Sequence, residues 1–146
     1  MSKQVFMFTM LGMILAGFLF SRTRAAGPTQ KSAQYAEPVK SPDGVYSIGA
    51  VRLWREYEEN EVAADSRYKN QRMRVMGTIV NIEQDYEGQP VLHLFGGNAI
   101  FPVVATLNKA DLPAVTRLKK GDQVVVRCMG AGRQMRMPQL ERCLML

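Results

Sequence analysis

The sequence predicts a mainly β domain, a five-stranded barrel with an N-terminal helix and a second helix between strands three and four. From residue 71 onward, short stretches alternate apolar and polar residues with the period of two that is typical of half-buried strands. Two other stretches, residues 50–57 and 108–118, repeat apolar residues with a helical period. Helix, three strands, helix, two strands is the order of an OB fold, whose closed barrel leaves no open sheet edge.

The first helix is expected to begin at Ser47, whose hydroxyl suits an N-cap. Its apolar stripe predicts an amphipathic helix packed on the barrel, and the stripe consists of Ala50, Leu53, Trp54 and Tyr57. The carboxylates of this region fall on several faces, so we expect a solvated surface for Glu56, Glu58, Glu59 and Glu61. A shorter turn should follow, with Val62 and Ala63 pointing inward.

The first strand is expected from Gln71 onward. Its alternation predicts a buried face made of Met73, Val75, Gly77 and Ile79, and an outer face made of Arg72, Arg74 and Thr78. A glycine inside a strand indicates a bend or bulge, as a tightly curved barrel requires. Turns at 85–88 and 96–98 bound a second strand at 91–95 and a third at 99–105, in which Pro102 indicates a sheet edge or a bulge.

The second helix is expected over residues 108–118. Asp111 would cap it and Pro113 would lie in its first turn, where a proline is tolerated. The fourth strand is expected at 123–128 and the fifth at 138–145. The glycines between them, Gly130 and Gly132, predict the connecting turn.

The N-terminus has the features of a secretory signal peptide. Lys3 precedes an uncharged apolar run, Val5 to Phe20, and small residues follow it near a cleavage point after Ala25 or Ala26. Arg22 and Arg24 oppose translocation and favour the alternative, an uncleaved anchor in the inner membrane formed by residues 5–20. Against the anchor, 16 residues are fewer than the roughly 20 that a spanning helix needs.

These features divide the chain into a signal peptide or anchor (1–26), a disordered linker (27–45) and an OB-fold domain (46–146). The linker assignment depends on three prolines in a stretch without apolar periodicity. We expect the domain to be exported, to the periplasm or cell envelope. Without residues 1–26 the net charge falls from +6 to +3, because 16 basic residues then face 13 acidic ones. The basic residues are dispersed, so the composition does not indicate a polyanion as the partner.

The two cysteines, Cys128 and Cys143, predict a disulfide between the last two strands. The midpoint between them falls near the centre of the expected hairpin, so the two can lie opposite each other. Strict alternation would aim the two sulfurs at different faces, because Val126 lies on the face of Cys128 whereas Leu140 and Leu144 lie on the face opposite Cys143. The disulfide therefore requires a bulge that shifts one strand by a residue.

Two runs resemble the tRNA-anticodon-like OB-fold family of exported bacterial proteins. The first is Glu59 to Asp65, continued by Tyr68-Lys69, Arg74-Val75 and Gly77-Thr78. The second is Leu118 to Asp122, continued by Val124, Val126, Cys128, Gly130, Leu140 and Cys143. The resemblance covers roughly residues 50–146 and implies an OB barrel and, often, export. It implies little chemistry, because a fold does not establish a function.

The sequence contains no recognisable catalytic constellation. His93 is the only histidine, which excludes a histidine-based triad or a multi-histidine metal centre within one chain. The spacing of the two cysteines matches no zinc pattern, and the glycine turns do not follow a phosphate-binding loop. We therefore expect a non-enzymatic protein with no cofactor and no metal.

The remaining hypothesis is a binding face on the barrel. An OB barrel usually binds through its second and third strands and the loops beside them, where aromatic side chains can stack on bases. The candidate residues are Arg72, Arg74, Tyr86, His93, Phe95, Phe101 and Arg127. We expect the partner to be an envelope protein, a peptide or a small ligand, and the alternative is a single-stranded nucleic acid on the same face. Membrane contact is expected only if the N-terminal segment stays uncleaved.

The first testable prediction concerns the leader. N-terminal sequencing of the protein from its native host should start near Ala26 or Gly27, because the apolar run after Lys3 directs export and cleavage. A product that keeps Met1 and stays in the membrane fraction would contradict cleavage and establish the anchor.

Overall fold

The computed structural model describes residues 33–146, so the expected leader and the first part of the expected linker lie outside the described residues. Within residues 33–146, no helix is long and apolar enough to cross a membrane. The elements are β1 (Val39–Lys40), β2 (Tyr46–Gly49), α2 (Ala50–Glu59), α3 (Glu61–Tyr68), β3 (Arg72–Gln84), β4 (Pro90–Leu94), β5 (Val103–Leu107), the 3₁₀ turn Lys109–Asp111, α4 (Leu112–Val115), β6 (Gln123–Gln134) and β7 (Met137–Met145).

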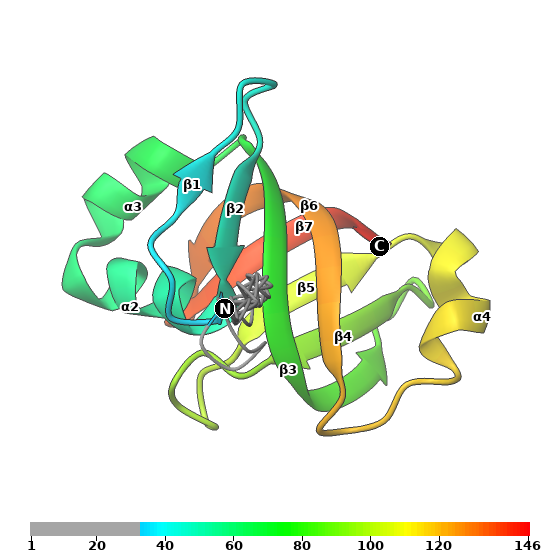
Figure 1. The fold of residues 1–146 in the computed structure, drawn as a ribbon. Coiled ribbons are helices and arrows are strands. Elements are labelled where there is room, and N and C mark those ends of the chain that lie inside the picture. The colour runs from blue at the N-terminus through cyan, green and yellow to red at the C-terminus, as the bar shows by residue number, and fades with distance from the viewer. Residues whose placement is uncertain (1–32) are drawn as a thin grey trace, which may run out of the picture.

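Strands β3 to β7 form a closed five-stranded barrel (Figure 1). The sheet runs in the order β3-β4-β5-β7-β6, and β6 returns to pair with β3. The β5–β7 pair is parallel and the other barrel pairs are antiparallel. The short helix α4 lies between β5 and β6 in sequence. The expected mainly β, five-stranded OB barrel is therefore confirmed.

The alternation expected in the first strand is present in β3. Met73, Val75 and Ile79 are buried, whereas Arg72 and Arg74 are exposed. The strand continues to Gln84. Its first half pairs with β6 and its second half with β4, so β3 closes the barrel by pairing with both of these strands. A Cβ added at Gly77 would lie 3.0 Å from the Cβ atoms of Ala50 and Leu94, so this glycine allows α2 and β4 to pack closely on the strand.

Residues 33–49 fold against the barrel, so the described part of the linker expected over residues 27–45 is ordered. Strand β1 pairs with β2, and β2 runs parallel to β3 along the edge that β4 leaves free. Gln34 is buried, its side chain donates a hydrogen bond to the Thr78 hydroxyl, and its backbone carbonyl accepts one from the Arg52 amide. Composition misled the prediction here, because these residues gain their order from contacts with the barrel.

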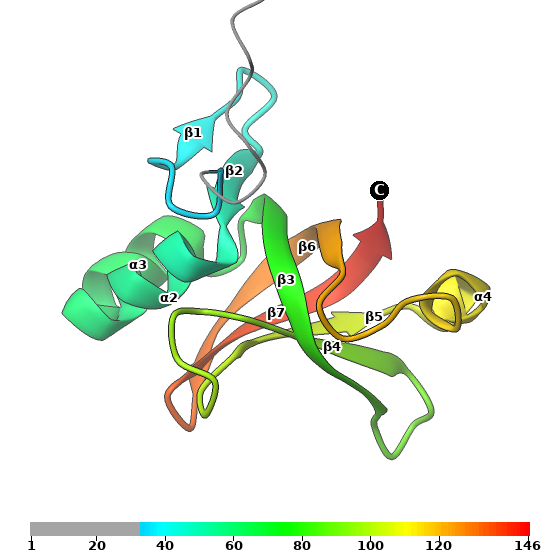
Figure 2. The ribbon, with the colours of Figure 1, turned by 60° about the horizontal axis from the view of Figure 1, so that its bottom comes forward.

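Helices α2 and α3 pack beside each other on one side of the barrel, and α4 lies on the opposite side (Figures 1 and 2). The expected stripe is inside, with Leu53 and Tyr57 buried and Trp54 half-buried against Gly96. Two details differ from expectation. Ser47 belongs to β2, so the helix begins after Gly49, and Val62 points outward while Ala64 and Tyr68 carry the buried contacts of α3.

The third barrel strand and the second helix are both shorter than expected. Strand β5 begins at Val103, directly after Pro102, because proline cannot donate to a strand ladder. Residues 109–111 form a 3₁₀ turn and α4 covers only Leu112–Val115, with Pro113 in its first turn as predicted. Asp111 precedes α4, but its side chain makes no capping hydrogen bond.

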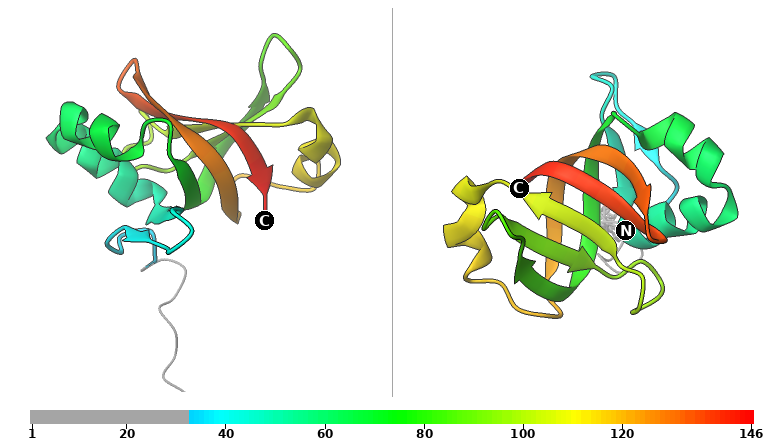
Figure 3. Two further views of the ribbon diagram at one scale, coloured as in Figure 1. Left: turned by 90° about the horizontal axis from the view of Figure 1, so that it is seen from above. Right: turned by 180° about the vertical axis from the view of Figure 1, so that it is seen from behind.

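The β6–β7 hairpin, coloured orange to red in Figure 3, turns at Met135 and Arg136, both with positive φ, rather than at the expected glycines. Gly130 lies within β6, where an added Cβ would be 2.1 Å from the Tyr68 carbonyl oxygen. Gly132 has a φ of 83° and occupies a register shift in β6. Gly130 therefore allows the end of α3 to approach β6 closely, and Gly132 allows the register shift. Neither glycine forms the turn.

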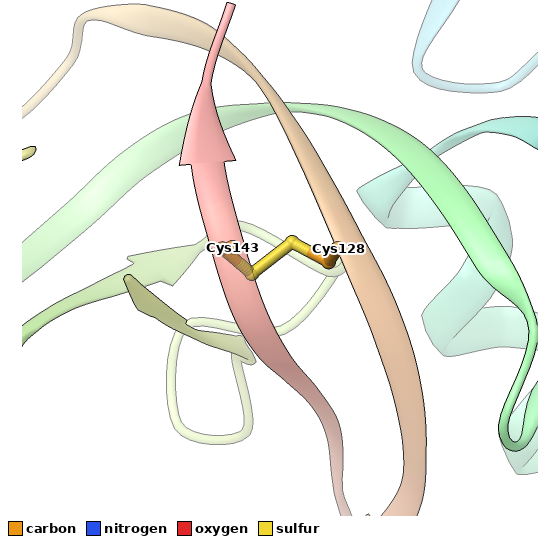
Figure 4. Close-up of a disulfide and its surroundings, with 2 residues drawn as sticks. All are labelled: Cys128 and Cys143. Atoms are coloured by element: carbon orange, nitrogen blue, oxygen red, sulfur yellow. A yellow bond between two sulfur atoms is a disulfide. The ribbon is translucent and has the colours of Figure 1, made fainter. Parts of the chain in front are cut away.

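A disulfide joins Cys128 of β6 to Cys143 of β7, with Cα atoms 4.1 Å apart (Figure 4). The expected bulge lies beside it. Arg127 pairs with Leu144 and Met129 pairs with Glu141, so β7 holds one extra residue opposite Cys128. The strand accommodates the extra residue at Arg142, whose φ is 50°. Both cysteines are consequently buried on the core side.

The second prediction is that this disulfide forms and stabilises the domain. Alkylation without reduction should leave both cysteines unmodified, and replacing both by alanine should lower the free energy of unfolding by about 3 kcal/mol for a loop of this length. Mass spectrometry and chemical denaturation provide the two readouts. Recovery of two alkylated cysteines from unreduced native protein would contradict the prediction.

Candidate ligand-binding surface

The outer face of β4 and β5, which OB folds usually use, is poorly suited to an anion. Neither strand contains an arginine or a lysine. The predicted residue His93 is on this face, and its Nε2 lies 2.7 Å from the Glu83 carboxylate. Its cross-strand neighbour Val104 is apolar. Because this histidine is already paired with a carboxylate, the face offers no unpaired basic side chain to a phosphate or carboxylate.

Two of the predicted aromatic residues lie apart from this face and from each other. Tyr86 is 97% exposed in the turn between β3 and β4. Phe101 is in the β4–β5 loop, where the guanidinium of Arg136 stacks on its ring at 4.8 Å from the centroid. Arg136 also pairs with Glu58, at 3.2 Å, so this cation is already engaged.

The three predicted arginines do come together, on the outer face of the β3–β6 ladder. Arg74 lies directly opposite Arg127 in the register of the two strands, and Ser47 of β2 lies on the other side of Arg74. Arg72 is two residues before Arg74 and donates a hydrogen bond to the Asp43 carbonyl. Neither Arg74 nor Arg127 forms an ion pair within residues 33–146.

A polar cavity of about 270 Å³ opens over this arginine pair. Its walls are Ser41, Asp43, Val45, Ser47, Arg74 and Arg127. Asp43 is the one acidic residue among them. The two facing guanidinium groups therefore leave the cavity with a net positive charge.

An apolar cavity of about 200 Å³ adjoins the first one and shares Arg74 and Ser47 with it. Met76 and Val125, the next outward-facing pair of the ladder, form part of its wall. The other lining residues come mainly from the N-terminal segment and are Ala33, Ala36, Glu37, Val39, Ile48 and Gly49. The carboxylate of Glu37 pairs with Arg52, at 3.0 Å.

A third cavity, of about 370 Å³, lies at the next outward-facing pair, Thr78 and Gln123. Two aromatic side chains line it, the predicted Phe95 and also Tyr35, which is 48% exposed. The side-chain oxygen of Gln123 is buried and has no hydrogen-bond donor among the described residues. The remaining lining residues are Gln34, Ile79, Val80 and Gly121.

The three cavities follow one another along the ladder and will be called the cavity row. Their floors are the pairs Arg74–Arg127, Met76–Val125 and Thr78–Gln123, each two residues beyond the last. The first cavity is charged, the second is apolar and the third is aromatic. Side chains two residues apart on a β-strand are separated by about 6.6 Å, so the three surfaces follow each other at this spacing.

Sequence reasoning missed the residues that wall the row on the N-terminal side, among them Gln34, Tyr35 and Ser41, because it assigned them to a linker. One signal was present. Pro42-Asp43-Gly44 is a turn sequence, and it lies between Val39-Lys40 and Val45-Tyr46, so it predicts a small hairpin. The structure contains that hairpin as β1 and β2.

Glu56, Glu58 and Glu61 form ion pairs, Glu59 is exposed, and the expected solvated surface is wrong for Glu56. This residue is 8% exposed. Its carboxylate accepts hydrogen bonds from Arg52 at 3.0 Å, from Arg67 at 2.8 Å and from the Tyr68 hydroxyl at 2.7 Å. It therefore ties α2 to α3. Glu58 similarly pairs with Arg133 of β6 and holds the helix to the hairpin.

Two buried tyrosines belong to the same network. Burial raises the pKa of Tyr57, and so does the hydrogen bond that its hydroxyl donates to Asp65. Burial also raises the pKa of Tyr68, together with its hydrogen bond to Glu56. Both phenols are thereby held in the neutral form, because ionisation would place a second negative charge beside a carboxylate.

A model of the tRNA_anti-like family matches residues 1–144. The chain belongs to the tRNA_anti-like family. The expected resemblance is confirmed, and the match also includes the N-terminal residues that the resemblance left out. No curated protein matches the chain significantly.

One solved structure supports the fold of this tRNA_anti-like protein. A "putative nucleic acid-binding lipoprotein" from Klebsiella pneumoniae subsp. pneumoniae MGH 78578 superimposes with a TM-score of 0.56 at 16% identity, over 68% of this chain and 90% of that one. The Stn1–Ten1 complex of S. pombe matches with a TM-score of 0.35 at 14% identity, over 73% of this chain and 81% of that one.

The third prediction follows from the two buried tyrosines. Their pKa in the folded state exceeds the ordinary value of 10.0, so the stability they contribute is complete below pH 10 and is lost as the pH rises above it. The free energy of unfolding should fall by up to about 1.4 kcal/mol per pH unit for each tyrosine. In alkaline denaturation series Tyr57→Phe should flatten this slope, whereas Tyr86→Phe, at an exposed site, should not. Equal slopes in all three proteins would contradict the assignment.

Proposed function

We propose that this protein is an exported, non-catalytic OB-fold binding module that binds an acidic peptide segment of an envelope protein along the cavity row. The observation that supports the proposal is the Arg74–Arg127 pair. Both side chains are exposed, they face each other across the ladder, and neither has an ion-pair partner within residues 33–146.

Like charges directly opposite each other destabilise a sheet. Most other arginines of the described domain have carboxylate partners, among them Arg52, Arg67 and Arg133. A bound carboxylate would accept hydrogen bonds from both guanidinium groups and would remove the repulsion. The arginine pair therefore destabilises the free protein and would stabilise a complex with a carboxylate ligand.

Export is supported by two features of the chain and by one comparison. The apolar run at residues 5–20 suits a leader, and the Cys128–Cys143 disulfide suits an oxidising compartment. The structurally similar Klebsiella protein is described as a lipoprotein. A periplasmic or envelope location would place the module among proteins that present exposed peptide segments.

The second candidate ligand is single-stranded nucleic acid. It is favoured by the description of the Klebsiella protein as a "putative nucleic acid-binding lipoprotein", and by the positive charge of the first cavity. Phosphates would occupy the arginine pair and bases would stack on Phe95 and Tyr35 in the third cavity.

The fourth prediction separates these ligands. A fluorescein-labelled hexaglutamate peptide should bind the mature protein in fluorescence anisotropy, and Arg74→Gln/Arg127→Gln should weaken this binding about tenfold or more, because charge-assisted hydrogen bonds are lost. Lys109→Gln/Arg117→Gln is the matched control, since it removes the same charge from the region around α4. Equal weakening in both variants would indicate a general charge effect and overturn the proposed site.

The same titrations with a labelled oligothymidylate of about fifteen nucleotides test the second candidate. Tight binding near 0.15 M salt, with a steep dependence on salt, would favour nucleic acid over peptide. Weak binding of the oligonucleotide alongside measurable peptide binding supports the leading proposal.

A further inference from the structure

We infer that the cavity row recognises an extended peptide by three alternate side chains, in the order acidic, aliphatic and tryptophan. This inference depends on the proposed function and makes it specific. It assigns the acidic residue to the Arg74–Arg127 cavity, the aliphatic residue to the Met76–Val125 cavity and the tryptophan to the Thr78–Gln123 cavity.

The spacing of the row is the first argument. Residues 74, 76 and 78 of β3 face outward in succession, and each has its cross-strand partner on β6. Successive outward positions on a strand lie about 6.6 Å apart, and so do the side chains i, i+2 and i+4 of an extended peptide. An extended peptide lying along the row therefore presents one side chain to each cavity.

The apolar middle cavity is the second argument, and it favours a peptide over a nucleic acid. Its floor, Met76 and Val125, and most of its walls are aliphatic. Arg74 is the one basic residue among those that line this space in the described part of the chain. A phosphodiester chain would lose hydration there without a partner, whereas an aliphatic side chain gains burial.

The third cavity supplies the third argument. Tyr35 and Phe95 offer two aromatic surfaces, and the larger volume of about 370 Å³ suits an aromatic side chain better than an aliphatic one. Gln123 lines this cavity, and its side-chain oxygen is buried without a donor among the described residues. An indole N–H entering this cavity would supply the missing donor, which a phenylalanine ring lacks.

Hydrogen bonds hold part of the wall of the row to the barrel and to α2. The Gln34 side chain is bonded to Thr78 at 2.8 Å, and its backbone carbonyl accepts the Arg52 amide at 3.1 Å. Strand β2 is held to β3 over four residue pairs. A surface of this kind loses little conformational entropy on binding, which favours recognition of a short peptide.

The test uses acetylated, amidated and fluorescein-labelled peptides with the mature protein in anisotropy titrations. The ordered probe contains Trp-Ser-Leu-Ser-Glu, a second probe contains its reverse, and the permuted probe Trp-Ser-Glu-Ser-Leu has the same composition and charge. We expect the ordered or the reversed probe to bind at least about tenfold more tightly than the permuted one, because only they match charge and apolar surface in register.

Two variants assign the probe's side chains to their cavities. Ala36→Trp fills the middle cavity from an exposed position and should weaken binding of the ordered probe, but not of hexaglutamate. Gln123→Leu should remove the preference for the tryptophan probe over its phenylalanine counterpart, which we expect to be about fivefold to tenfold in the wild type. Thermal melts of both variants confirm that the barrel remains folded.

The outcomes distinguish the inference from the function on which it depends. Equal binding of ordered, reversed and permuted probes, with sensitivity to Arg74→Gln/Arg127→Gln retained, would overturn the inference and leave the acidic-peptide function standing. Loss of any effect of the arginine variants would overturn both. Tighter binding of oligothymidylate than of every peptide would assign the row to nucleic acid and also overturn the inference.

Discussion

The pairing of β3 with β6 closes the barrel, and the other elements are arranged around the strand that makes this pairing possible. The 13 residues of β3 pair with β6 in the first half and with β4 in the second. The strand changes partner after Thr78, and Gly77 lies just before this change, where an added Cβ would be 3.0 Å from the Cβ atoms of Ala50 and Leu94. Closure, core packing and the seating of α2 therefore depend on one short stretch of β3.

The same division of β3 creates the surface on which a ligand is proposed to bind. Where β4 departs, one edge of β3 is left free, and β2 occupies it over Met73–Met76. Residues 33–49 therefore lie beside the outward side chains of β3 and β6 and form one side of the cavities. An edge that would otherwise attract another chain is covered, and a row of cavities results. The usual OB face on β4 and β5 carries no comparable charge.

The hairpin of β6 and β7 combines two requirements on side-chain direction. The extra residue at Arg142 turns Cys143 into the core opposite Cys128, while Arg127, the neighbour of Cys128, stays on the outer face beside Arg74. The disulfide thus fixes the strand that presents one half of the arginine pair. At the other end of the hairpin, Arg133 pairs with Glu58 and fixes its position relative to α2.

Features with a local cause could be predicted from the sequence. These include the strand period of β3, the apolar stripe of α2, the family resemblance and the cysteine pair with its bulge, because alternation and spacing act between near neighbours. The tertiary structure decided the rest. It ordered the segment around Gln34, which has no apolar period and is held by contacts with Thr78 and Arg52. It buried Glu56 among residues from two helices, and it placed Arg74 opposite Arg127. Those contacts join residues distant in sequence, and the register that makes them is set by closure of the whole barrel, which no local pattern contains.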